Sequence, residues 1–141
     1  QAGLNLGYTE SARMQAVFNT TSRGFGAFFE EWDIILTPIT ALPTPRIGAT
    51  EYLTTSDNPS VQDWFANLWR FFAYTPLANL CGIPGISLPL AEQQNGLPLG
   101  IQAQAKLGND GLLLQLAAQI ERAIDGRWNA GRLPGIHVTH P

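Results

Sequence analysis

Proline and glycine punctuate two apolar runs within residues 75–102, which read TPLANLCGIPGISLPLAEQQNGLPLGIQ. Proline cannot donate to a strand ladder, and glycine in a strand marks a bend or a close backbone approach. We therefore predict two short strands with fixed ends, one at 86–88 that stops at Pro89 and one at 99–105. The Asn-Gly turn signal at 95–96 predicts a hairpin or a neighbouring antiparallel pair. Such rigid connections suit a small-molecule site, although sharp corners alone would explain them equally well.

The N-terminal third combines one long helix with a short strand. Apolar residues at spacings of three and four predict a helix over 9–32 whose apolar face packs in the core. That face consists of Met14, Phe18, Thr21, Phe25, Phe28 and Trp32. A buried strand at 32–36 is expected to follow and to end at Thr37-Pro38, because proline interrupts the ladder. Residues 39–59 show no apolar period and are expected to form an irregular loop.

Two further helices are predicted in the rest of the chain. Ser60 is placed to cap a helix that runs to about residue 73, with Asp63 in the position of a weak capping box. One face of this helix carries Trp64, Phe65, Leu68, Phe71 and Phe72. Residues 77–81 fit a turn or a short helix. A last helix at 111–123 has a clear leucine and alanine face.

Composition limits the classes of function. Charged residues make up 13% of the chain, against roughly a quarter in average proteins, so this is either a domain covered by further protein or a small neutral-polar one. The net charge of −3 and the scattered arginines give no basic stripe, which argues against nucleic-acid binding. No apolar run approaches the ~18 residues of a membrane span. The single cysteine, Cys81, suits a reducing compartment, so we expect a cytoplasmic protein.

No assembled catalytic or metal site is found among these residues. The five serines lie outside glycine-rich loops, and the one lysine, Lys106, is expected to be a solvated surface residue. A Cys81 nucleophile would need a histidine, but His137 and His140 both lie in the expected C-terminal tail. Two histidines and one cysteine do not build a usual zinc site. We expect neither a metal nor a cofactor.

Three segments nevertheless follow one another in a characteristic order. They are EEWDIILTPITALPTPRIG, TPLANLCGIPGISLPLA and GLPLGIQAQAKLGNDGLLLQLAAQIERA. The first ends a strand with D-x-hydrophobic-hydrophobic-T-P, the second carries N-x-x-G-x-P-x-x-S-x-P, and the third begins G-L-P-x-G-hydrophobic-Q. The matching positions are Asp33, Thr37, Pro38, Asn79, Gly82, Pro84, Ser87, Pro89, Gly96, Leu97, Pro98, Gly100 and Gln102. Over residues 10–125 the chain resembles the C-terminal portion of amidase signature family enzymes.

The resemblance implies an α/β fold, here a partial mixed sheet flanked by about three helices, as the C-terminal part of the family's α/β/α architecture. Residues 1–125 would belong to the amidase domain, and 126–141 would be an irregular tail. The family hydrolyses amides with a Ser-cis-Ser-Lys triad in a region that this sequence lacks, so no catalytic residue is carried over. The segment would instead form part of the acyl-pocket wall, with the helix end at 71–74 and the turn at 75–81 as its local contributors. The candidates for substrate contact are Tyr74, Thr75, Asn79 and Cys81.

Several interpretations stay open at this point. Asn79 fits a turn-stabilising role better than a substrate contact, and Tyr74 and Cys81 fit a place in the core better. The expected partners are the missing N-terminal part of the same polypeptide and a small-molecule amide, and open sheet edges predict self-association of the chain alone. The chain could be part of an amidase and inert by itself, part of the A subunit of a tRNA-dependent amidotransferase, or a non-catalytic scaffold or binding module. The aromatic face of the helix at 64–72 favours the amidase.

Overall fold

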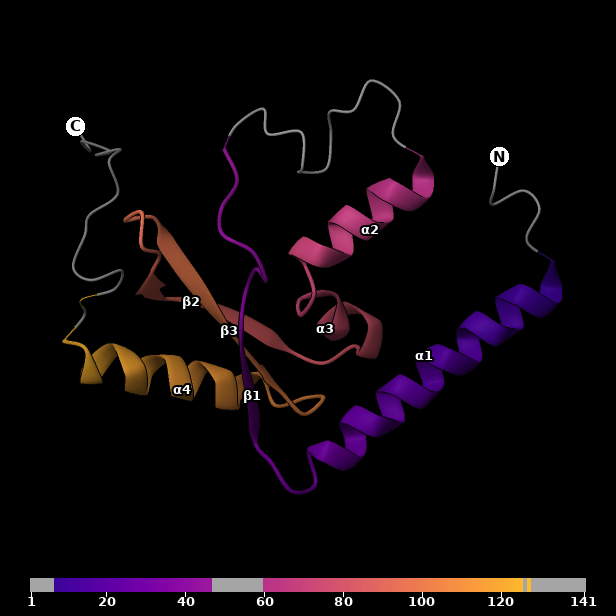
Figure 1. Cartoon of the computed structure of the whole chain (residues 1–141). Helices are drawn as coiled ribbons and strands as arrows, with labels where there is room; N and C mark the ends of the chain where they lie inside the picture. Colours follow the sequence, from indigo (N-terminus) through magenta and orange to yellow (C-terminus); the bar gives the residue numbers. More distant parts are fainter. Residues whose placement is uncertain (1–6, 47–59, 126, 128–141) are drawn as a thin grey trace, which may run out of the picture.

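The computed structural model describes residues 7–46, 60–125 and 127. In these ranges four helices accompany three strands, one helix more than the roughly three expected (Figure 1). The elements are α1 (Tyr8–Phe28), β1 (Ile34–Pro38), α2 (Val61–Phe71), α3 (Pro76–Cys81), β2 (Gly85–Glu92), β3 (Pro98–Ala105) and α4 (Asp110–Ala123). The α/β fold class is confirmed. The tail predicted at 126–141 lies outside the described residues except for Arg127.

The three strands form one antiparallel sheet in the order β1-β3-β2. The predicted pairing of β2 with β3 is confirmed, and the described strands pair only antiparallel. The prediction that Pro89 ends β2 is wrong, because the strand continues to Glu92. The register shifts between Leu88 and Ala91, and this irregularity places Pro89 where no regular ladder bond is needed.

The first strand begins later than predicted. The N–H of Trp32 donates to the carbonyl of Phe28 at 3.1 Å, so residue 32 still belongs to the turn that closes α1. Strand β1 therefore starts at Ile34 and includes Pro38. Proline is accepted there because β1 is at the edge of the described sheet, with β3 on one side.

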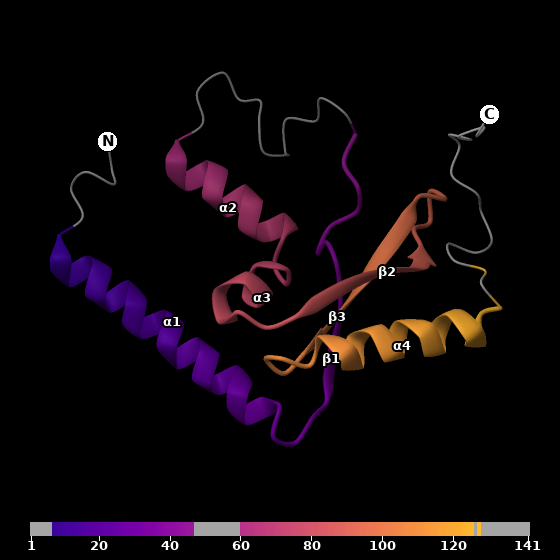
Figure 2. The same cartoon turned by 180° about the vertical axis from the view of Figure 1, so that it is seen from behind.

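One face of the sheet packs against α4 and holds the core. Ala103, Ala105 and Leu113 are buried together, and Ile34, Ile86, Leu112 and Leu116 pack around them. Two alanines on β3 let the α4 backbone approach the sheet closely. Helix α4 lies along this face in both views, whereas α3 and α2 lie on the other side of the sheet (Figures 1 and 2).

The core role predicted for the first helix is wrong. No residue of α1 is buried, Met14 is 53% exposed and Trp32, beyond its end, is 59% exposed. The helix projects from the body and lies against α3 (Figure 2). An apolar stripe is buried only where another element covers it, and little of the described chain covers this one.

The cap predicted for the second helix is confirmed, and residues 77–81 adopt the helical alternative. The Ser60 hydroxyl accepts from the Asp63 N–H at 3.1 Å and donates to the Asp63 carboxylate at 2.6 Å. Helix α3 ends at Gly82, whose φ of +67° is the left-handed conformation that favours glycine. None of the described helices has the length and apolar character to cross a bilayer.

Candidate functional site

The four residues predicted to contact substrate lie on one short segment around α3. Tyr74 is exposed on the connection from α2, and Thr75, partly buried, directly precedes Pro76 at the start of α3. Asn79 is exposed, and Cys81 is a partly buried free thiol at the end of the helix. The four-residue spacing of Thr75 and Asn79 brings them toward one side of the chain. Their contact with a substrate stays a prediction.

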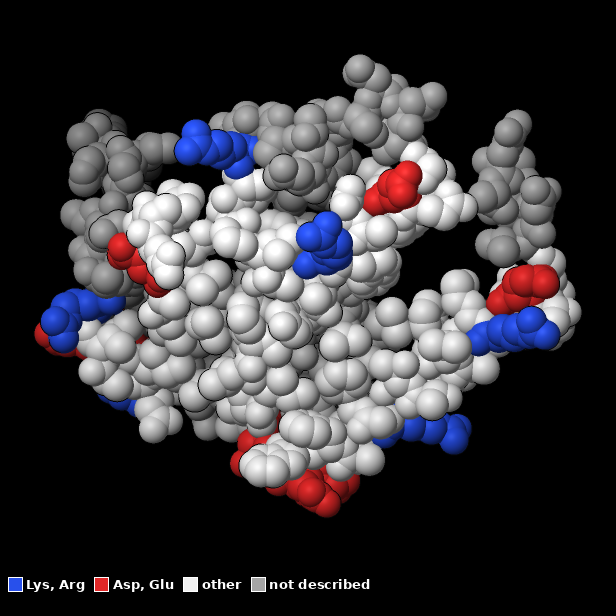
Figure 3. Space-filling view, viewed as in Figure 1, with Lys and Arg blue, Asp and Glu red and all other residues white. Residues whose placement is uncertain are grey.

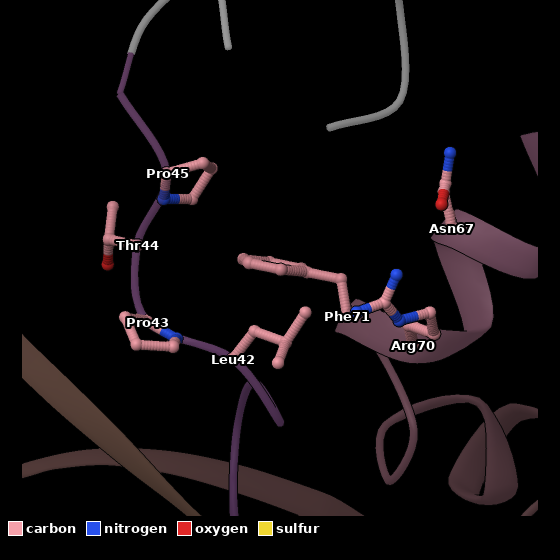
Figure 4. A pocket seen from close by; sticks show the side chains of 7 residues that line it. All are labelled: Leu42, Pro43, Thr44, Pro45, Asn67, Arg70 and Phe71. Atoms are coloured by element: carbon pink, nitrogen blue, oxygen red, sulfur yellow. The ribbon is translucent and has the colours of Figure 1, made fainter. Parts of the chain in front are cut away.

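A hollow of about 520 Å³ lies beside this segment, between the chain at 42–45 and the last turns of α2. None of the four predicted residues lines it. The ring of Phe71 extends from α2 toward the proline-rich wall, and Asn67 and Arg70 project from the same helix (Figure 4). Sequence reasoning missed Asn67 and Arg70. Asn67 precedes Arg70 by three residues and Phe71 by four, and this helical spacing was the signal that could have grouped them.

Hydrogen bonds fix the walls of this hollow. The Ala41 N–H donates to the Phe71 carbonyl at 2.9 Å, which ties the loop to the end of α2. The Thr44 N–H donates to Gln93 Oε1 at 3.2 Å, and Gln93 Nε2 donates to Thr44 Oγ1 at 2.8 Å. These two bonds join the loop to the β2–β3 turn. The loop wall of the hollow is therefore held on two sides.

The described residues do not assemble a serine–lysine pair. Lys106 Nζ lies 2.6 Å from Glu30 Oε1, and both side chains are exposed. Ser87 is paired with Gln102 on β3, four residues before Lys106, which corresponds to roughly 13 Å along the strand. Ser60 is engaged as a helix cap. Among the described residues, none form a group of three or more His, Cys, Asp or Glu that could hold a metal.

The Glu30–Lys106 ion pair is expected to make the stability of the fold depend on pH. The hydrogen bond and positive charge of Lys106 lower the pKa of Glu30, so the pair's contribution to stability is present above the unfolded pKa and is lost as pH falls through the lowered one. Lys106→Met should move the pKa of Glu30 up to its ordinary value, as read from the carboxyl resonance in an NMR titration. Arg122→Gln, on α4, is the control and should leave it unchanged. An identical Glu30 titration in Lys106→Met would contradict the pair.

The sheet face opposite the core carries a row of polar side chains. Gln102 is paired with Thr37 on β1 and with Ser87 on β2, so the three point to the same side. Gln104, on the same face, is 2% exposed. Thr37 Oγ1, Gln102 Oε1 and Gln104 Nε2 are buried and have no hydrogen-bond partner among the described residues. Buried polar atoms normally have partners, so this face needs a polar group or water from outside the described chain.

Comparison with known proteins adds a second line of evidence. A family model described as Amidase matches residues 5–114. The "Putative amidase AmiC" of Mycobacterium leprae (strain TN) is 45% identical over 96 residues, which are 68% of this chain and 19% of that protein. The 6-aminohexanoate-cyclic-dimer hydrolase of Paenarthrobacter ureafaciens is 36% identical over 102 residues, or 72% of this chain and 20% of that one. The A subunit of the glutamyl-tRNA(Gln) amidotransferase of Syntrophus aciditrophicus (strain SB) is 36% identical over 121 residues, or 84% and 23%.

The fold of this chain also matches part of the fold of solved amidase structures. A solved structure of 6-aminohexanoate cyclic dimer hydrolase superposes with a TM-score of 0.73 at 31% identity, and covers 95% of this chain and 27% of that one. A crystal structure described as an amidase gives a TM-score of 0.65 at 27% identity, over 86% of this chain and 26% of that one. The chain thus spans about a fifth of the length of the curated relatives named above.

Proposed function

Because the chain belongs to the amidase family, we propose that it forms part of the substrate-pocket wall of an enzyme that hydrolyses small-molecule carboxamides, and that it is inert by itself. The family-model match and the M. leprae relative confirm the family resemblance seen in the three sequence motifs. The observation that carries the proposal of inertness is the position of Lys106. Its ammonium group is bound to Glu30, far from Ser87, so neither side chain can activate the other for attack on a carbonyl.

The pocket role rests on what the segment around α3 presents. Tyr74 and Asn79 are exposed, and Thr75 and Cys81 are partly buried, so all four can contact a group that docks on this side. Three atoms of the buried polar row, Thr37 Oγ1, Gln102 Oε1 and Gln104 Nε2, lack hydrogen-bond partners among the described residues. Further protein or a bound polar molecule would satisfy these atoms, as expected for an incomplete site.

The pocket role is testable in a chimera in which this chain replaces the matching segment of the M. leprae protein. Tyr74→Ala and Cys81→Ala should raise KM for a good amide substrate by about tenfold with a smaller change in kcat, because lost ground-state contacts act through binding. Leu114→Ala, on the exposed side of α4, is the matched control. An unchanged KM in both pocket variants, with Leu114→Ala also unchanged, would contradict the proposal.

The proposed partner is the remainder of a longer polypeptide, which would cover the exposed apolar residues of α1. Figure 3 shows broad uncharged areas between the charged groups of one face. We expect the chain alone to self-associate through such surfaces, with a mass above that of a monomer in size exclusion with light scattering. Met14→Glu with Val17→Glu, both on α1, should shift it toward monomer. A monomer at every concentration, before any substitution, would contradict this expectation.

A second candidate function is a part of the A subunit of a tRNA-dependent amidotransferase. It is favoured by the S. aciditrophicus relative, which matches more of this chain than the M. leprae protein does, although at lower identity. The two functions differ in substrate. Chimeras made in parallel with the S. aciditrophicus and M. leprae proteins would distinguish them. Glutamine hydrolysis in preference to simple carboxamides would favour the amidotransferase.

A further inference from the structure

The hollow between the chain at 42–45 and α2 combines a cation with apolar walls. Its walls are made by Leu42, Pro43, Pro45 and Phe71, and its polar groups come from Asn67, Arg70 and Thr44. A volume of about 520 Å³ falls in the range of sites for small organic molecules, roughly 300–1,000 Å³. Figure 4 shows the aromatic ring of Phe71 set across from the prolines, with Arg70 and Asn67 on the helix beside it.

The positive charge of Arg70 gives this hollow a preference for anions. Its side chain is exposed, and it has no carboxylate partner among the described residues. A guanidinium group offers several N–H donors in a planar fork that matches a carboxylate with two parallel hydrogen bonds. Asn67, one helical turn before Arg70, adds an amide that can donate to the same anion.

The rigidity of the walls is a second, independent observation. The loop is bonded to α2 through Ala41 and Phe71, and to the β2–β3 turn through Thr44 and Gln93. Two prolines restrict the backbone further. A site that is already formed loses little conformational entropy when a ligand binds.

We propose that this hollow is a binding site for a small carboxylate with an apolar or aromatic body. The carboxylate binds Arg70 and Asn67, and the body packs against Leu42 and the proline-rich wall. The site is separate from the predicted substrate residues at 74–81. The proposal concerns binding alone and does not rest on amide hydrolysis by any part of the protein, so the two can fail independently.

The test uses benzoate and benzamide, which share a shape and differ in charge. In a 1H–15N NMR titration of the 141-residue chain, benzoate should shift the resonances of Thr44, the Asn67 side chain and Arg70. Its dissociation constant should be about tenfold lower than that of benzamide, because a charge-assisted bond replaces a neutral one. Equal affinities, or shifts that spread away from these residues, would overturn the proposal.

Substitutions assign the preference to one side chain. Arg70→Gln should remove the difference between benzoate and benzamide, and Arg70→Glu should shift the preference to benzylammonium. Arg122→Gln is the matched control, because Arg122 occupies the last turn of α4 as Arg70 occupies that of α2 but does not line the hollow. A benzoate preference that survives Arg70→Gln, or that is lost in Arg122→Gln, would refute the assignment.

The chain's own acidic residues are the remaining competitor for Arg70. Glu51 and Asp57 lie in the segment that connects the two walls of the hollow. If they rather than a free ligand filled the site, benzoate would bind only after both were replaced by their amides. Binding to the unsubstituted chain supports the proposal, and binding that requires Glu51→Gln with Asp57→Asn overturns it.

Discussion

Leu113→Ala is expected to lower the free energy of unfolding by about 3 kcal/mol, because removal of the leucine side chain leaves a cavity in the centre of the core. Leu113 is 3% exposed and packs against Ala103 and Ala105. The two alanines are too small to fill the space, and their β-strand backbone cannot move toward α4 without breaking ladder bonds. The measurement is urea denaturation followed by circular dichroism.

The adjacent residue supplies the control for this prediction. Leu114 has the same side chain on the same helix but is 64% exposed. Leu114→Ala should change the free energy of unfolding by no more than about 0.5 kcal/mol. Similar losses in the two variants would mean that α4 does not pack on the sheet through Leu113.

Gly100→Ala is expected to cost about 2 kcal/mol, because β3 has no room for a side chain at this position. A Cβ atom here would lie 2.8 Å from Ile39 Cγ1 and 3.2 Å from Ser87 Oγ. Ile39 cannot easily move away, since its side chain is β-branched and its N–H is bonded to the Gly100 carbonyl at 3.0 Å. The same denaturation experiment measures the loss.

Gly111→Ala provides the opposite case. A Cβ at Gly111 meets nothing within 4 Å, and the residue lies in α4, so alanine should stabilise the chain by about 0.5 kcal/mol through helix propensity. A neutral or stabilising result for Gly100→Ala would show that the contact between Ile39, Ser87 and β3 is not formed as described.

Local signals predicted the elements that depend on nearby residues. Ser60 with Asp63 three residues on forms its cap as expected, and the Asn95-Gly96 turn joins two antiparallel strands. The end of β2 was predicted wrongly, because a proline terminates a strand only if its position needs a ladder bond. The register shift beyond Leu88 arises from pairing with β3 and has no signature in the sequence around Pro89.

The burial of helix side chains and the shape of the hollow depend on residues that are distant in the sequence. Periodicity correctly predicted a helix near Met14 and Phe18, but it carries no information on what covers that helix. The hollow likewise joins Leu42 and Pro43 to Arg70, which are far apart in the chain. Sequence reasoning proposed a substrate role for the segment at 74–81 and a wall role for Phe71, and it missed the rest of the hollow because no motif includes both walls.

We propose that the described residues shape a site but place no group in position to attack an amide carbonyl. The most direct measurement is ammonia release by the purified 141-residue chain from a panel of simple carboxamides, with Ser87→Ala and Lys106→Met prepared in parallel. We expect all three proteins to release ammonia at the rate of buffer alone. Release by the unsubstituted chain that disappears in Ser87→Ala or Lys106→Met would contradict it.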